Sequence, residues 1–148
     1  MGEDLTQLIR ERFSYPQLDA KQYSPLALAF VGDAVYSLLV RTKCLCEKEC
    51  TVNHLHKHAA DTVKAEAQKE LMLEMLPKLT GEEEAVFKRG RNANPHSVAK
   101  NASVTDYRIA TGFEALLGYL YLNGRTERIL NLVFPEEERK QQATDNME

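Results

Sequence analysis

The chain has 148 residues, of which 43% are hydrophobic and 28% are charged, and its net charge is −3. These values are typical of one globular domain with a sizeable core, and the length leaves no room for a second domain. No apolar run reaches the roughly 18 residues that cross a membrane, and the first residues lack the basic-then-apolar order of a secretory signal. We therefore expect a cytoplasmic protein without a membrane segment.

The spacing of apolar residues is helical almost throughout, which predicts an all-α fold. The first long helix is expected over residues 25–46, because Pro25 follows Ser24 as a cap and the apolar run continues for about six turns. A more polar helix is expected over residues 54–76, ended by Pro77. Its apolar stripe would consist of Leu55, Ala59, Val63, Ala67, Leu71 and Met75.

The second half of the chain predicts three further helices. Residues 81–92 carry acids at the start and bases at the end, which suits the helix dipole. After a loop rich in Asn, Pro and Ser, the pair Ser103 and Asp106 is typical of a helix start, and a last helix is expected over residues 126–134. The folded domain would therefore span residues 1–134, and the charged tail, residues 135–148, would be disordered.

Two of the predicted helices are apolar and contain one acid each. Asp33 is the only charged residue in LALAFVGDAVYSLLV, and Glu114 is the only one in ATGFEALLGYLYL. If these helices pack together, their acids could face one another, and two carboxylates in a core need a cation or a shared proton between them. Oxygen ligands suit magnesium or manganese. Alternatively, each acid caps a backbone amide or meets a lysine, and the charge pattern favours neither interpretation.

A group of cysteines and histidines is the competing candidate site. Its members are Cys44, Cys46, Cys50, His54, His56 and His58. They crowd into fifteen positions, whereas structural zinc sites usually place two ligand pairs on either side of a loop. We therefore expect a small core cysteine, two cysteines near a turn and exposed histidines. Three cysteines also cannot all pair within one chain, which argues against a disulfide framework.

The bases concentrate in one segment. The tail holds five acids and two bases, so residues 1–134 are neutral overall. Between residues 88 and 108 the bases face only one acid, Asp106, and this segment leads into the Glu114 helix. The candidate RNA-binding residues are Lys88, Arg89, Arg91, Asn92, Lys100 and Arg108, with Asn94 and Ser97 as further donors. Next to a carboxylate site, phosphate contact explains them better than a solvated helix end does.

Two motifs resemble those of the ribonuclease III catalytic-domain family. AFVGDAV, residues 29–35, resembles the family's signature, and FEALLGYLYL, residues 113–122, resembles its second carboxylate helix. Leu26, Ala29 and Thr111 stand where the fullest form of the family has acids. With the segment FKRGRN and no following RNA-binding domain, the chain is most similar to the short bacterial branch of the family, Mini-ribonuclease III. The resemblance covers roughly residues 24–132.

The resemblance implies a ribonuclease III-like helical bundle that hydrolyses double-stranded RNA. Asp33 and Glu114 would be the catalytic ligands of Mg²⁺, with Mn²⁺ as the alternative ion. The substrate would be a precursor of the large-subunit (23S) ribosomal RNA, and a ribosomal protein would present it. With only two protein ligands, metal should bind weakly to the free protein. The alternative is a helical RNA- or protein-binding module that kept the fold without catalysis, although binding alone would not need both acids.

A homodimer is expected because one basic segment contacts few phosphates, and two-fold symmetry would double these contacts. Phe30 lies three residues before Asp33. By resemblance to the family, this phenylalanine inserts into a pocket on the partner subunit. Alternatively, Phe30 is a core aromatic, because Leu26, Phe30 and Ala34 share one helical stripe.

Overall fold

The computed structural model describes residues 4–17, 19–47, 51–53, 61–93 and 103–147. These residues form helices and no strands, which confirms the all-α prediction. The α-helices are α1 (Leu5–Phe13), α2 (Pro25–Cys46), α4 (Asp61–Met75), α5 (Gly81–Asn92), α6 (Val104–Leu122), α7 (Thr126–Val133) and α8 (Glu136–Met147). Short 3₁₀ helices occupy Ala20–Gln22 and Leu76–Lys78.

Polar caps start the main helices where the sequence predicts them. The Ser24 hydroxyl accepts a hydrogen bond from the Ala27 amide at 3.1 Å, and Pro25 takes the first helical position of α2. At the start of α6, the Ser103 hydroxyl accepts from the Asp106 amide at 3.1 Å. Thr80 and Glu83 form a reciprocal capping box at the start of α5. Each cap fixes where an apolar face begins.

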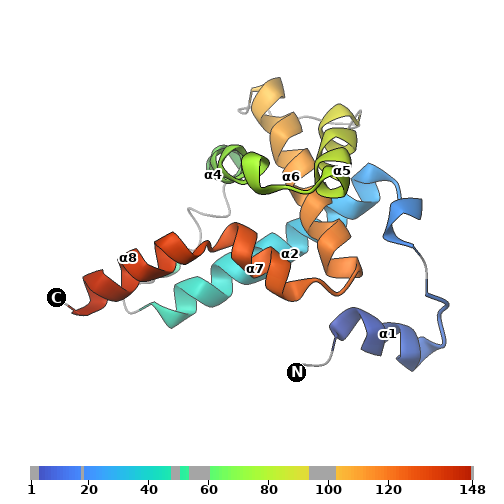
Figure 1. The fold of residues 1–148 in the computed structure, drawn as a ribbon, viewed down its shortest axis with the longest axis horizontal. Coiled ribbons are helices and arrows are strands. Elements are labelled where there is room, and N and C mark those ends of the chain that lie inside the picture. Colours follow the sequence, from blue (N-terminus) through green and yellow to red (C-terminus); the bar gives the residue numbers. More distant parts are fainter. Residues whose placement is uncertain (1–3, 18, 48–50, 54–60, 94–102, 148) are drawn as a thin grey trace.

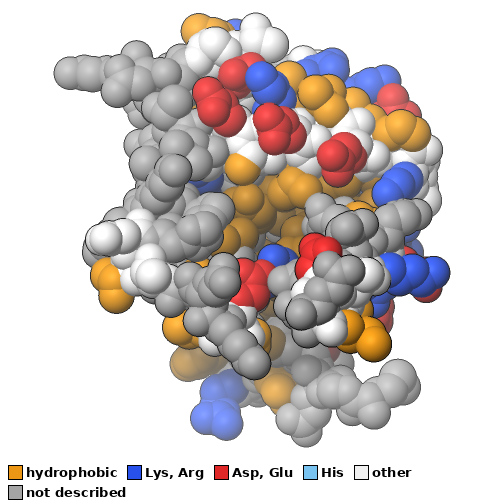
Figure 2. Space-filling model, turned by 90° about the vertical axis from the view of Figure 1, so that its left-hand side faces the viewer, with side chains coloured by type: hydrophobic (Ala, Val, Ile, Leu, Met, Phe, Trp, Pro, Cys, Tyr) orange, Lys and Arg blue, Asp and Glu red, His pale blue; other side chains and the backbone are white. Residues whose placement is uncertain are grey.

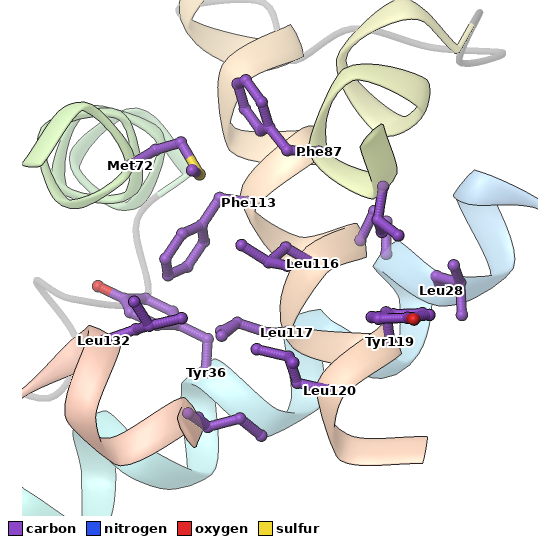
Figure 3. Close-up of a cluster of buried hydrophobic side chains, with 14 of the residues drawn as sticks. Leu28, Tyr36, Met72, Phe87, Phe113, Leu116, Leu117, Tyr119, Leu120 and Leu132 are labelled. Carbon is purple, nitrogen blue, oxygen red and sulfur yellow. The ribbon is translucent and has the colours of Figure 1, made fainter. Parts of the chain in front are cut away.

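Helix α6 lies at the centre of the fold, with α2, α4, α5 and α7 around it (Figure 1). Its side chains point into the core from several sides, as Figure 3 shows for Phe113, Leu116, Leu117 and Leu120, none of which is exposed to solvent. The ring of Tyr36 on α2 meets the ring of Phe113 edge to face, with centroids 5.3 Å apart. The helix that carries Glu114 is therefore held by its neighbours along its length.

The buried stripe of α4 differs from the predicted one. Ala65, Gln68, Met72 and Met75 are buried, whereas Ala67 and Leu71 are only partly buried, and Leu55 and Ala59 lie outside the described residues. Gln68 is polar but occupies a core position, so the spacing of apolar residues does not predict which side of α4 is buried. The side-chain nitrogen of Gln68 has no hydrogen-bond partner among the described residues.

The tail also corrects a prediction. Residues 135–148 were expected to be disordered, whereas Glu136–Met147 form helix α8, which extends to the C-terminus at one side of the molecule (Figure 1). The segment is rich in residues with high helix propensity, and Lys140 pairs with Glu136 one turn earlier. Local preferences of this kind form a helix without an apolar face.

Helix α2 spans the residues 25–46 that the sequence predicts, and its apolar composition bears on the expectation of no membrane segment. By length and composition alone it could cross a membrane, with a mean hydropathy of 1.3 over an 18-residue window. The sequence has no uninterrupted apolar run of that length, because Asp33 and Arg41 interrupt the segment. In the structure, α2 packs against α6 and contributes Leu28, Ala29 and Tyr36 to the core. Only 22% of that window is buried, so the rest of the apolar surface of α2 is not covered by the described residues.

Candidate active site

Two glycines bring the backbones of α2 and α6 into direct contact. A Cβ atom on Gly32 would lie 1.7 Å from the carbonyl oxygen of Glu114, and one on Gly118 would lie 1.9 Å from the carbonyl oxygen of Leu28. No side chain fits at either position, so only glycine permits this approach. Because residue 32 meets 114 and residue 28 meets 118, the two helices run antiparallel. The crossing places Asp33, which follows Gly32, beside Glu114.

Asp33 lies at the surface end of the site. Its side chain is 48% exposed, and its Oδ1 atom pairs with the Nζ atom of Lys64. Lys64 comes from α4, a helix that carries neither of the two motifs, and its side chain is 21% exposed. A lysine partner was one of the two interpretations open for each acid, and for Asp33 the structure shows such a lysine. The site is thus built by three helices.

Glu114 lies deeper than Asp33. Burial raises the pKa of the Glu114 carboxyl to about 8, and the negative charge of Asp33 acts in the same direction. The positive charge of Lys64 acts against this rise in pKa. A hydrogen bond between the carboxyl groups of Asp33 and Glu114 raises the pKa of Glu114 further. Without a metal, Glu114 is largely protonated at neutral pH. A second positive charge at the pair would favour the ionised carboxylate.

Tyr36 and Thr111 are two further buried residues on the helices that carry the acids. Tyr36 follows Asp33 by three residues and is buried; burial raises its phenol pKa, and the charge of Glu114 adds to the rise. Thr111, which stands where the fullest form of the family has an acid, is also buried. Its hydroxyl donates to the Tyr107 carbonyl oxygen at 2.9 Å, within its own helix. Thr111 is therefore satisfied locally.

The two carboxylates suit a hard divalent cation. Their oxygen atoms are the donors that Mg²⁺ and Mn²⁺ prefer, and Asp33 is exposed enough to be reached from solvent. Within the described ranges, no group of three or more His, Cys, Asp or Glu side chains could hold a metal ion. A cation at Asp33 and Glu114 would therefore take its remaining ligands from water and from RNA phosphates.

The candidate RNA-binding residues lie on the last turns of α5 and the first turns of α6. Lys88, Arg89, Asn92 and Arg108 are exposed, and Arg91 is partly buried. The Arg91 guanidinium lies 5.5 Å from the centre of the Phe87 ring, so part of its role is packing. Lys88 pairs with Glu84 at 2.9 Å. Lys100, Asn94 and Ser97 lie outside the described residues.

Charge is unevenly distributed over the molecule. Figure 2 shows one face on which acidic side chains gather beside a hydrophobic hollow, while Lys and Arg side chains lie mostly toward the edges. The described residues on this face do not form a continuous basic surface. The neutral balance of residues 1–134 therefore hides local differences in charge.

Phe30 is not a core aromatic. Its side chain is 82% exposed, although it lies on α2 only three residues from Asp33. Leu38 and Leu45, which are 64% and 75% exposed, follow it along the same side of the helix. The structure thus excludes one of the two interpretations of Phe30 and shows an apolar stripe without a partner among the described residues.

The cysteine and histidine cluster can be followed only in part. Cys44 is buried, as expected of a small core cysteine, and it is disulfide-bonded, whereas the thiol of Cys46 is exposed and free. A count of three cysteines excludes complete pairing, but it does not exclude one bond. Cys50, His54, His56 and His58 lie outside the described residues.

Lys64 is the member of the site that sequence reasoning missed. It belongs to a segment with several other charged residues, and nothing in its local pattern distinguishes it from Lys69 on the same helix. The only signal was indirect, because a partly buried acid on α2 requires a cation from elsewhere in the chain.

Comparison with known proteins places both acids inside a recognised domain. Residues 26–125 match the family model of the ribonuclease III domain. A protein of Thermoanaerobacter sp. (strain X514) named Mini-ribonuclease 3 is 51% identical over 110 residues, which cover 74% of this chain and 78% of that protein. Another of the same name, from Enterococcus faecalis (strain ATCC 700802 / V583), is 50% identical over 117 residues, covering 78% and 89%.

A solved structure supports the same fold. The crystal structure of protein FN1578 from Fusobacterium nucleatum is similar to this chain with a TM-score of 0.67 and 30% sequence identity. The similarity covers 78% of this chain and 92% of the other.

Proposed function

Since this chain belongs to the ribonuclease III family and is an endoribonuclease of the Mini-ribonuclease 3 type, which acts on double-stranded RNA, we propose that Asp33 and Glu114 form its catalytic metal site. The observation that carries the proposal is the contact between α2 and α6. It joins the two carboxylates of two separate motifs at one point of the fold. A module that only binds RNA or protein would not need both acids at this point.

The site residues have different tasks in this proposal. Mg²⁺, or Mn²⁺ in its place, would supply activation of water and neutralisation of phosphate charge. Asp33, half exposed, is the ligand that faces solvent and therefore the incoming RNA. Glu114 holds the deeper side, and its ionisation depends on a cation because burial disfavours its charge. Tyr36 is buried close to Glu114 and limits water on the protein side.

RNA would be bound mainly through its phosphates. The exposed bases Lys88, Arg89 and Arg108 lie on α5 and at the start of α6, the helix that also carries Glu114. Contacts of this kind depend on salt and carry little sequence information. Duplex RNA hides its deep groove, so recognition would be mainly of shape.

A homodimer would give each strand of the duplex its own centre. The support is the exposed apolar stripe of Phe30, Leu38 and Leu45 on α2, because exposed apolar patches of this kind mark interaction sites. Phe30 would insert into the partner subunit close to the site, since it precedes Asp33 by less than one helical turn.

The substrate we propose is a precursor of 23S ribosomal RNA, with a ribosomal protein presenting it, in the cytoplasm. The test is to incubate the purified protein with such a precursor and with an unrelated duplex, each with Mg²⁺, with Mn²⁺ and with a chelator. We expect metal-dependent cleavage of both and preferred cutting of the precursor when ribosomal protein is added. If both RNAs are cut equally with and without the ribosomal protein, the proposed substrate is wrong. If cutting continues in chelator, the proposed metal dependence is wrong.

A further inference from the structure

Lys64 differs from the other lysines that form ion pairs in the described residues. Its side chain is 21% exposed, compared with 30% for Lys69 and 44% or more for Lys21, Lys43, Lys88 and Lys140. Most surface pairs of this kind contribute little, because water competes with them. The partial burial of Lys64 makes its charge more effective than that of an exposed lysine.

The ammonium of Lys64 acts on both acids of the site. It pairs directly with Oδ1 of Asp33, and its charge also reaches Glu114, where it favours the ionised carboxylate. No other ion pair to either acid occurs in the parts of the chain that the structure describes. Lys64 therefore balances the negative charge of Asp33 and favours ionisation of its neighbour Glu114.

A divalent cation at the same carboxylates would compete with this ammonium. Both use the lone pairs of Asp33, and two positive charges a few ångströms apart repel one another in a partly buried site. The lysine side chain has four carbons in a flexible stem, so its head can leave the carboxylate without any movement of α4.

We propose that Lys64 is an internal counter-cation that a divalent metal ion must displace from Asp33, so that Lys64 lowers the metal affinity of the free protein. This inference rests on the proposed function, because it takes Asp33 and Glu114 as the metal ligands. Lys64 then acts on the metal site only through Asp33, from a helix outside both family motifs.

The test measures metal binding without RNA. Mn²⁺ affinity is determined by calorimetry and by the paramagnetic signal of free Mn²⁺ for the wild type, Lys64→Met, Lys64→Arg and Asp33→Asn. Lys64→Met keeps the apolar stem and removes the charge, and we expect it to bind Mn²⁺ roughly three to ten times more tightly. Lys64→Arg keeps the charge and should bind as weakly as the wild type.

A matched control comes from the same helix. Lys69 pairs with Asp106 at 3.2 Å, so Lys69→Met removes one positive charge from α4 without touching Asp33. We expect its Mn²⁺ affinity to stay within twofold of the wild type. An equal gain in Lys69→Met would mean that overall charge, and not displacement at Asp33, sets the affinity.

The outcomes separate the two proposals. Loss of Mn²⁺ binding in Asp33→Asn without a gain in Lys64→Met would overturn the role of Lys64 and leave the metal site standing. Unchanged binding in Asp33→Asn would overturn the metal site itself. Thermal unfolding in chelator checks that every variant is folded, and the rise in Tm on adding Mn²⁺ gives a second measure of affinity, expected to be largest for Lys64→Met.

Discussion

Arg128 on α7 donates two hydrogen bonds to the carboxylate of Glu83 on α5. Its Nε atom lies 2.9 Å from Oε2, and its Nη2 atom lies 2.8 Å from Oε1. The same Nη2 atom donates to the carbonyl oxygen of Lys78 at 2.8 Å. The Glu83 side chain is only 1% exposed, so the carboxylate of this pair is buried. The pair joins α5, which carries basic residues at its end, to α7.

Replacing Arg128 by methionine should lower the free energy of unfolding by about 2–3 kcal/mol, because it leaves a buried carboxylate without its partner. The hydrogen bond from Arg128 is the main cause that lowers the pKa of Glu83 below its ordinary 4.5. The pair therefore stabilises the fold above pH 4.5, and this stabilisation is lost as pH falls through the folded-state pKa. Urea unfolding at pH 7 and at pH 3 measures the loss, which should shrink at the lower pH.

Lys88→Met is the control for this prediction. The pair of Lys88 with Glu84 is exposed on both sides, so its removal should cost less than about 1 kcal/mol. Equal losses in the two variants would show that burial of Glu83 has no bearing on the pair's contribution.

Asp33→Asn and Glu114→Gln should each abolish cleavage of duplex RNA while the protein stays folded. Either change removes a negative charge that the metal needs and relieves repulsion between the two acids. Single-turnover cleavage with Mg²⁺ measures the loss of activity, and far-UV circular dichroism shows whether each variant is folded. Glu70→Gln, an exposed acid on α4, should leave the rate unchanged. Near-normal cleavage by either site variant would reject the catalytic assignment.

Glu114 should give the metal-free protein an unusual dependence of stability on pH. Its folded-state pKa of about 8 lies above its ordinary value of 4.5, so the unfolded state ionises first and stability falls as pH rises from about 4.5 to 8. Glu114→Gln should remove this fall, which amounts to a few kcal/mol at most for a partly buried group. Urea unfolding in chelator between pH 5 and pH 8.5 measures it. Parallel curves for the two proteins would contradict the raised pKa.

Neutralising Arg89 should weaken RNA binding for all duplex sequences alike and reduce its dependence on salt. Arg89→Gln removes one exposed base from the end of α5, so the slope of log affinity against log salt should fall by about one. Filter binding at several salt concentrations provides the slope. Arg139→Gln on α8 is the charge-matched control and should leave the salt slope unchanged.

Arg91→Gln should also cost about 0.5–1 kcal/mol of stability, because Arg91 packs over Phe87.

Phe30→Ala should make the dimer dissociate without destabilising the monomer. A side chain that is 82% exposed in one chain contributes little to that chain's own core, whereas an aromatic anchor in an interface contributes a few kcal/mol to association. Sedimentation over a range of concentrations measures the shift, and Leu73→Ala on α4, another exposed apolar residue, serves as the control. A wild-type protein that sediments as a monomer at micromolar concentration would defeat the dimer outright.

The two central helices could be predicted from the sequence because their signals are local. Apolar runs longer than four turns, capped by Ser24 and Ser103, determine α2 and α6 with little help from the rest of the chain. The pairing of Asp33 with Glu114 followed from one further requirement, that buried acids need charge compensation.

What the sequence could not supply depends on contacts between distant segments. Lys64 meets Asp33 across 31 positions, and Arg128 meets Glu83 across 45, so no spacing rule reveals either pair. Gln68 was missed for a related reason, because a polar residue in a core is recognisable only once its neighbours are known. The tail was misjudged because a lack of apolar residues was taken to exclude a helix, whereas Glu136–Met147 form one.

The glycines at the helix crossing make the distance between the two acids a property of the main chain. With Gly32 against Glu114 and Gly118 against Leu28, α2 and α6 are locked in register, and a slip by one turn would move Asp33 by about 5.4 Å. Substitutions in the side-chain core should therefore reduce stability well before they change the spacing of the ligands. Position 64 lies on a third helix, so a substitution there can change the charge beside the two acids without shifting the crossing of α2 and α6.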